Sequence, residues 1–285
     1  MKSEIRNPKS EIRLTRRVGF SSGHRYWIPV LSPEENRKLF GQWASPFNHG
    51  HNYALEVTVA GKIDAATGMV VNIKTIDDIL QDVVVARFDQ RSINDEIEYF
   101  QSRAATLESL LLYLASLLGI GVLPPQTELQ GLRLYETDSL YGDYVKNDGA
   151  WTMTLTRIYE FAAAHRLNVP GMTQSQNEEL FGKCNNPSGH GHNYTVEVTV
   201  EGEPDERTGM MVDLVALDQA VEDLVVERYD HKNLDMDIPE FQNRTTTSEV
   251  IAQEIFNRLD GKLPARLSRV RLFETARSSF EVSRT

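Results

Sequence analysis

Residues 180–194 read Leu180-Phe181-Gly182-Lys183-Cys184-Asn185-Asn186-Pro187-Ser188-Gly189-His190-Gly191-His192-Asn193-Tyr194, and the rest of the chain is organised around them. The His-x-His pair runs into an alternating β-branched segment, 195–200, which predicts a half-buried strand. Residues i and i+2 of a strand share a face, so His190 and His192 point the same way, as two ligands of one metal ion must. The Asn/Pro/Gly-rich loop before them can fold Cys184, the only cysteine, back over the same place.

The same pattern occurs a second time, earlier in the chain. His49 and His51 form another His-x-His pair, and again a strand-like segment, 54–60, follows. Each pair has a further histidine 25 residues upstream of its first member, His24 in one case and His165 in the other. The two triplets use six of the seven histidines, so chance is a poor explanation of the pattern.

An internal repeat sets the architecture. A shift of 141 residues superimposes the histidine triplets and several short motifs, namely Leu39-Phe40-Gly41 on Leu180-Phe181-Gly182, Thr67-Gly68-Met69 on Thr208-Gly209-Met210, Asp89 on Asp230 and Glu108 on Glu249. The chain is therefore predicted to hold two domains, 12–140 and 152–285, with a linker at 141–149.

Each domain has one coarse secondary-structure prediction. Two strands flank the histidines, and an amphipathic helix follows at 73–86 or 214–227. A second helix starts near Thr106 or Thr247, with a capping box predicted at Thr246 and Glu249, and two strands around 132–136 or 270–274 close the domain. The order ββααββ predicts an α+β fold with an antiparallel sheet. Open sheet edges need partners, so we expect oligomerisation.

Composition excludes several classes of partner. The net charge of −11 argues against nucleic acid, since binding phosphates at scale needs a basic surface. One cysteine permits no intrachain disulfide and gives no sign of an oxidising compartment. No apolar run approaches the roughly 20 residues of a membrane span, and residues 1–13 form a polar leader without a signal core. We expect a cytoplasmic protein.

Three histidines without a fourth protein ligand are typical of a catalytic zinc, which keeps one coordination position open. We therefore predict two zinc sites with the ligands His24, His49 and His51 in the first domain, and His165, His190 and His192 in the second.

Two groups in the second domain are candidates for proton transfer. Cys184 lies in a polar loop beside the predicted dication, where the thiolate is favoured, although an unplaced cysteine is more often a small buried hydrophobe. Asp230 precedes His231, the one histidine outside the triplets, and can orient its ring as an acid/base pair. The alternative for His231 is a helix C-terminal residue stabilised by the helix dipole.

Glu274 is predicted on a strand, where its carboxylate suits a ligand edge with two adjacent N–H donors; an exposed strand glutamate is the alternative.

The first domain lacks the two proton-transfer groups of the second. Trp43 takes the place of Cys184, and Gln90 takes the place of His231. Both proton-transfer groups are missing, so we predict a first domain that binds metal without catalysis.

Residues 157–277 resemble the 6-pyruvoyl-tetrahydropterin synthase family, which includes 6-carboxy-tetrahydropterin synthase. The resemblance is carried by the runs 161–166, 181–194, 230–237, 246–249 and 274–275. The five-residue gap between Cys184 and His190 resembles the pyruvoyl branch. The first domain is similar to the same family but breaks the pattern at Trp43 and Gln90.

The resemblance implies tandem tunnelling-fold domains whose antiparallel sheets close into a barrel on oligomerisation. It also implies zinc and the conversion of 7,8-dihydroneopterin triphosphate to 6-pyruvoyl-tetrahydropterin with loss of triphosphate. Glu274 would hold the pterin, Cys184 and the pair Asp230-His231 would move protons, and Arg166 and Lys183 are candidates for phosphate contacts. The alternatives are the 6-carboxy-tetrahydropterin synthase activity on the same substrate, or a non-catalytic pterin- or zinc-binding protein.

For assembly, the family resemblance implies rings of three subunits, stacked in pairs. The active site would take its cysteine from one subunit and its Asp-His pair from the next. Only the second domain of this chain carries either part, so we expect a homo-oligomer, a trimer of chains with one ring of second domains stacked on one ring of first domains.

Overall fold

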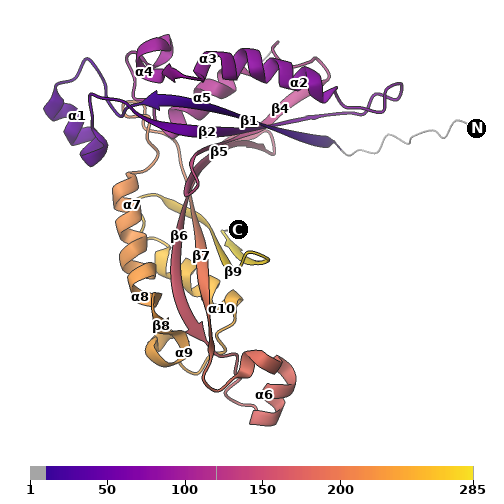
Figure 1. The fold of residues 1–285 in the computed structure, drawn as a ribbon, viewed down its shortest axis with the longest axis vertical. Helices are drawn as coiled ribbons and strands as arrows, with labels where there is room; N and C mark the ends of the chain where they lie inside the picture. The colour runs from indigo at the N-terminus through magenta and orange to yellow at the C-terminus, as the bar shows by residue number, and fades with distance from the viewer. Residues whose placement is uncertain (1–10, 120, 285) are drawn as a thin grey trace, which may run out of the picture. The chain divides into compact units, whose positions relative to one another are not determined.

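The computed structural model of the chain describes residues 11–119 and 121–284 (Figure 1). The first ten residues of the predicted leader lie outside this range. The chain divides into two compact units. Unit 1 runs to Leu155 and includes Gly202–Met211, and unit 2 comprises Thr156–Glu201 and Val212–Thr285.

Unit 1 has a sheet with the strand order β5-β4-β2-β1-β3. Its strands are β1 (Ile12–His24), β2 (His49–Gly61), β3 (Arg91–Ser92), β4 (Thr127–Thr137) and β5 (Leu140–Asn147). Its helices are α1 (Pro33–Phe40), α2 (Ile73–Leu80), α3 (Ala86–Phe88), α4 (Ile93–Glu96) and α5 (Leu107–Leu117), with 3-10 turns at Gly41–Trp43 and Glu98–Phe100. β1 and β2 are antiparallel, and their register places His24 opposite His49.

Unit 2 repeats this plan, with the strand order β10-β9-β7-β6 and with β8 pairing β6. Its strands are β6 (Ala150–His165), which begins within unit 1, β7 (His190–Glu201), β8 (Lys232–Asn233), β9 (Arg266–Thr275) and β10 (Ser278–Ser283). Its helices are α6 (Gln174–Phe181), α7 (Leu214–Val221), α8 (Glu227–Tyr229), α9 (Leu234–Asp237) and α10 (Ser248–Leu259), with 3-10 turns at Gly182–Asn185 and Pro239–Phe241.

Alternation along the second strand of each unit builds the core. In β7 every other side chain is fully buried, from Tyr194 through Val196 and Val198, and the helical residues Leu217 and Val221 are buried as well. The same pattern recurs in unit 1, where Tyr53, Leu55, Val57 and Val59 are buried together with Ile76 and Leu80. One face of each sheet is therefore covered by helices, as the ββααββ prediction requires. The α+β prediction is confirmed.

The helix after the histidine strands is more irregular than its periodicity predicts. A five-residue π-helix follows α2 at Gln81–Val85, and another follows α7 at Glu222–Val226. The predicted helices 73–86 and 214–227 are therefore present, but each contains one wide turn.

Two local predictions were wrong. The segment 141–149 is no linker, because most of it forms β5, and a two-residue turn then leads into β6. The turn residues Asp148 and Gly149 have φ values of 48° and 86°, as expected for a tight hairpin with Asp-Gly at its tip. The N-cap of α10 is Thr247, whose hydroxyl accepts from the Val250 N–H, so Thr246 does not form the predicted capping box.

Where the chain is described, none of its helices combines the length and the apolar character that a bilayer crossing requires.

Candidate functional site

The three histidines of unit 2 converge where β6 ends and β7 begins. His165 is the last residue of β6, and His190 and His192 open β7. The ring centroid of His165 lies 4.6 Å from that of His190 and 5.3 Å from that of His192. Each ring offers one nitrogen to a common point, and these three nitrogens lie within 4.8 Å of one another.

The free nitrogens of this triplet fit a bound cation. Nε2 of His165, Nε2 of His192 and Nδ1 of His190 are buried and have no hydrogen-bond partner among the described residues. Leaving buried polar atoms unpaired costs free energy, and a metal ion between the rings would pair the nitrogens that face it. Three imidazoles without thiolates are the donor set of a zinc that keeps an open position. The residues present therefore fit zinc.

The protonation states suit a metal site too. Burial lowers the pKa of His165 and of His192, so both rings are neutral near neutral pH. Metal ligation needs the neutral imidazole, whose free nitrogen keeps its lone pair. The sequence-predicted triplet is thus brought together in a form ready to bind metal.

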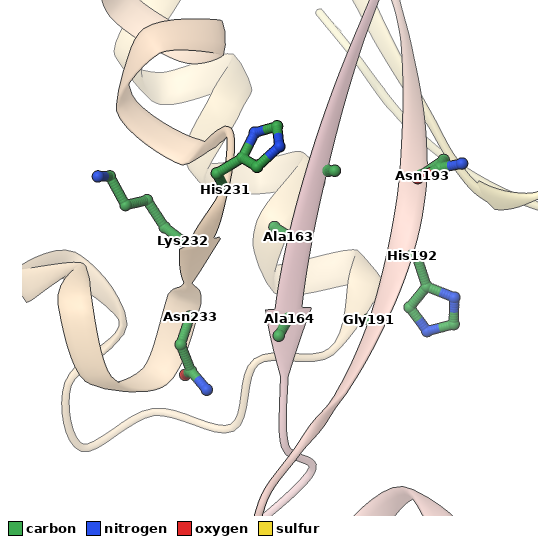
Figure 2. Close-up of a pocket in the computed structure, with 9 residues that line it drawn as sticks. Ala163, Ala164, Gly191, His192, Asn193, His231, Lys232 and Asn233 are labelled. Carbon is green, nitrogen blue, oxygen red and sulfur yellow. The ribbon is translucent and has the colours of Figure 1, made fainter.

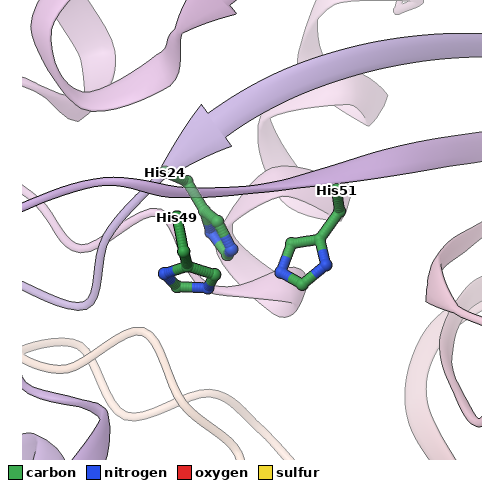
Figure 3. A group of neighbouring side chains, drawn as sticks. All are labelled: His24, His49 and His51. Carbon is green, nitrogen blue, oxygen red and sulfur yellow. The ribbon is translucent and has the colours of Figure 1, made fainter.

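Unit 1 repeats the arrangement (Figure 3). His24, at the end of β1, lies 4.4 Å from His49 and 5.1 Å from His51 between ring centroids, and the three side chains point toward one another. Burial lowers the pKa of His24 to about 3 and that of His51 to about 4. The Nε2 atoms of both residues are buried without a hydrogen-bond partner among the described residues. The first triplet fits a cation as well as the second.

Glu274 lies beside the second triplet. Its Oε1 is 3.6 Å from Nε2 of His165 and 3.7 Å from Nε2 of His192, and its side chain is 24% exposed. The Ser248 hydroxyl, at the start of α10, donates to the same oxygen at 2.7 Å. In unit 1, Glu136 occupies the equivalent place, 3.6 Å from Nε2 of His51, but is only 6% exposed. A carboxylate therefore lies next to each predicted metal position.

Cys184 lies in the 3-10 turn Gly182–Asn185, after α6. Its backbone oxygen accepts the Leu167 N–H at 2.9 Å, which ties the turn to the chain two residues beyond His165. The side chain is partly exposed, so the alternative of a buried hydrophobe does not describe it.

Asp230 and His231 form a hydrogen-bonded pair, as the sequence predicts. Nδ1 of His231 is 2.6 Å from Oδ2 of Asp230, and the His231 side chain is 84% exposed. Oδ1 of Asp230 accepts the Ala162 N–H at 2.7 Å; this bond first, and His231 second, lower the pKa of Asp230. A carboxylate beside Nδ1 keeps a proton there and leaves Nε2 to exchange one.

His231 lines an open groove along β6, and His192 of the triplet lines the same groove. Figure 2 shows the His231 ring beside β6, whereas the His192 ring projects from the far side of β7. The groove is also lined by Ala163 and Asn233. His231 and His192 therefore border one groove, while their rings project on opposite sides of the two strands.

Sequence reasoning missed two polar side chains of the second site, Ser248 and Tyr194. The Tyr194 hydroxyl is buried without a hydrogen-bond partner among the described residues, and its ring packs edge-on against His192 at 5.6 Å. The repeated Asn-Tyr pair after each His-x-His motif, Tyr53 in unit 1, was the available signal. No comparable repeat marks Ser248, because Leu107 stands at its place in unit 1.

Comparison with known proteins agrees with this α+β metal-site architecture. The family model described as 6-pyruvoyl tetrahydropterin synthase matches the chain twice, over residues 13–147 and 154–285. The 6-pyruvoyl tetrahydrobiopterin synthase of Drosophila melanogaster is 47% identical over 126 residues, which is 44% of this chain and 75% of that protein. The human protein of that name is 45% identical over 122 residues, 42% of this chain and 84% of that protein.

Among solved structures, the 6-pyruvoyl tetrahydropterin synthase of Caenorhabditis elegans is 38% identical, with a TM-score of 0.45, and the match covers 47% of this chain and 96% of that one. Two successive α+β units, each with a histidine triplet, define a tandem metal-site protein. The chain belongs to the 6-pyruvoyl tetrahydropterin synthase family, with two family units in tandem.

Proposed function

We propose that unit 2 is a zinc-dependent 6-pyruvoyl-tetrahydropterin synthase, a carbon–oxygen lyase. The substrate is 7,8-dihydroneopterin triphosphate, and the products are 6-pyruvoyl-tetrahydropterin and triphosphate. The observation that carries the proposal is the juxtaposition of the histidine triplet with Glu274, 3.6 Å from His165, in a chain of this family. The reaction is an internal redox change, because oxidation of the two hydroxyl carbons to carbonyls is balanced by reduction of the ring C=N bond and, as triphosphate leaves, by reduction of the carbon that carried it to a methyl group; no outside oxidant is needed.

The residues have distinct roles in this proposal. His165, His190 and His192 would hold the zinc ion, which supplies Lewis acidity that makes the carbon-bound protons of the substrate side chain removable. Glu274 accepts the N–H donors of the pterin edge, and the Ser248 hydroxyl holds Oε1 of that carboxylate in place at 2.7 Å.

Proton movement is assigned to Cys184 and His231. As a thiolate, Cys184 takes a proton from the substrate side chain, and its partial exposure supports access to substrate. Asp230 orients His231 and stabilises its charged form, so that His231 returns or relays a proton. The exposed position of His231 supports a role at the site of a neighbouring subunit.

Unit 1 is proposed to bind zinc through His24, His49 and His51 without catalysing the reaction. Its proton-transfer positions hold Trp43 and Gln90, neither of which titrates near neutral pH. The domain limits 12–140 and 152–285 are proposed from the repeat alone; the family matches run over 13–147 and 154–285. Assembly into a trimer of chains with stacked rings stays a prediction, which the mass in light scattering tests.

Turnover tests the proposed function. Pure protein incubated with 7,8-dihydroneopterin triphosphate should release triphosphate and form a product with the mass of 6-pyruvoyl-tetrahydropterin. The product of 6-carboxy-tetrahydropterin synthase has a different mass, so the same measurement separates the two branches. Bound pterin without any product would favour a non-catalytic binding protein.

A further inference from the structure

A pocket in unit 2 lies where β6 ends and β7 begins, and its lining combines two arginines, amide side chains and the carboxylate of Asp235. Arg166 directly follows the ligand His165, and Gly189 directly precedes His190. Arg166, Asn168, Gly189, Asn233 and Arg244 line the pocket. It therefore adjoins the strand ends that carry the metal ligands.

The charge of Arg166 is not neutralised by a carboxylate. Its guanidinium donates to the backbone oxygen and the side-chain oxygen of Asn185 and to Oε1 of Gln174, all of them neutral acceptors. Among the described residues, no carboxylate forms an ion pair with it, and its Nη1 group has no hydrogen-bond partner. Nη1 carries two N–H donors. The second arginine, Arg244, is already paired with Glu254 at 3.1 Å.

The equivalent arginine of unit 1 is neutralised. Arg25 aligns with Arg166, and its two terminal nitrogens donate to the two carboxylate oxygens of Asp95 at 2.8 and 2.5 Å. This bond holds the pKa of Asp95 well below its usual range, so the carboxylate stays charged. The residue that aligns with Asp95 in unit 2 is Met236, which is 76% exposed.

The two arginines share one backbone contact, but its acceptor is an amide in unit 1 and a carboxylate in unit 2. The N–H of Arg25 donates to Oδ1 of Asn94 at 2.9 Å, and the N–H of Arg166 donates to the aligned Asp235 at 2.6 Å. The side chains that meet the two guanidinium groups differ. Unit 1 has a carboxylate on its guanidinium, and unit 2 has an exposed methionine in its place.

We propose that the Arg166 pocket is the polyphosphate subsite of unit 2, and that Met236 keeps it open to the triphosphate group of the substrate. An arginine with free N–H donors beside amide side chains suits phosphate oxygens, whose hydrogen bonds to guanidinium are charge-assisted. In unit 1, Asp95 already occupies the arginine and would repel a polyphosphate. The subsite rests on the proposed function for its natural ligand, but its affinity for inorganic tripolyphosphate can be measured without turnover.

Calorimetric titration of the zinc-loaded full chain with inorganic tripolyphosphate tests the subsite. Met236→Asp restores the carboxylate found in unit 1 and should weaken binding about tenfold or more, since a charge-assisted interaction is lost. Arg166→Gln should weaken binding to a similar extent. Met236→Leu, which keeps the apolar surface, should bind like the wild type. Zinc content measured after each titration shows that tripolyphosphate has not stripped the metal.

The reciprocal change in unit 1 is the matched control. Asp95→Met frees Arg25 and should add a second tripolyphosphate site to the chain. Affinity that is equal in Met236→Asp and wild type, or no added site in Asp95→Met, would overturn the proposal. Enzyme assays separate this failure from that of the proposed function. If the chain turns over the pterin triphosphate with a KM that Met236→Asp does not change, the proposed function stands and the subsite is wrong. If tripolyphosphate binds in a charge-dependent way but no turnover occurs, the subsite stands and the proposed function is wrong.

Discussion

Nδ1 of His165 donates to the backbone oxygen of Thr246 at 2.7 Å, and this bond decides which ring nitrogen is offered to a metal. A carbonyl oxygen only accepts, so Nδ1 carries the proton and Nε2 keeps its lone pair. In unit 1, Nδ1 of His24 makes the same bond to Ala105, also at 2.7 Å. The residue before the N-cap of the second long helix therefore fixes the tautomer of one ligand in each unit.

Because both triplets have this geometry, we expect two zinc ions per chain, one at each group of three histidines. Metal analysis of the purified protein measures the stoichiometry. His24→Ala should remove one of the two ions and leave turnover in place, whereas His165→Ala should remove the other together with turnover. A wild-type content of one ion per chain would mean that the loop of Trp43 prevents metal binding at the histidine triplet of unit 1.

Cys184→Ala should reduce turnover about a hundredfold or more, because it removes the proposed base but no metal ligand. Zinc content and pterin affinity should stay close to those of the wild type. The matched control adds Trp43→Cys in unit 1 to the Cys184→Ala chain. This double variant should stay inactive, because Gln90 of unit 1 still cannot carry a proton. Near-normal turnover of Cys184→Ala would retire the assignment.

Glu274→Gln should weaken pterin binding about tenfold to a hundredfold, because a carboxylate that accepts two N–H donors is replaced by an amide that presents one acceptor. Fluorescence titration with dihydroneopterin, which lacks the triphosphate, measures this affinity without the polyphosphate subsite. The matched variant is Glu136→Gln in unit 1, which should leave turnover unchanged. Equal pterin affinity in Glu274→Gln and wild type would contradict the role.

The repeat made the fold and the triplets predictable, because duplicated His-x-His pairs and period-2 strands are features of the sequence itself. His190 and His192 share a face for a reason of strand geometry alone. Glu274 lies close to His165 because β7 pairs with β9, with Thr195 opposite Phe273. The local sequence of either strand does not specify this register. The same holds for Ser248, whose hydroxyl meets Glu274 only because the start of α10 packs beside the end of β9.

The segment 141–149 shows that composition alone can predict the wrong local structure. Tyr141–Gly149 contains Gly, Asp and Asn, which favour loops, and this composition suggested a linker. Pairing with β4 overrides it, since Tyr141 lies opposite Tyr135 in the sheet and is buried. Tertiary pairing therefore decided the structure of a segment whose composition predicted otherwise.

Glu240 is expected to make the stability of unit 2 sensitive to acid. Its carboxylate accepts from Arg228 and, at 3.1 Å, from Arg258, and its side chain is 14% exposed. The hydrogen bonds from Arg228 are the main reason that the pKa of Glu240 falls from 4.5 to about 2. A carboxylate with a lowered pKa in the folded state stabilises the fold above its unfolded pKa, and this contribution is lost as the pH falls from 4.5 toward 2.

Glu240→Gln removes that contribution. Near neutral pH the variant should lose about 1.5–3 kcal/mol of unfolding free energy, the usual value for hydrogen bonds to a charged group. The difference from wild type should shrink as the pH approaches 2, where the wild-type carboxylate is also protonated. Urea unfolding of zinc-free protein across this range measures both quantities without a contribution from metal release. Glu179→Gln, at an exposed position, is the control and should change neither. A Glu240→Gln deficit that stays constant with pH would show that the loss comes from packing and not from the charge.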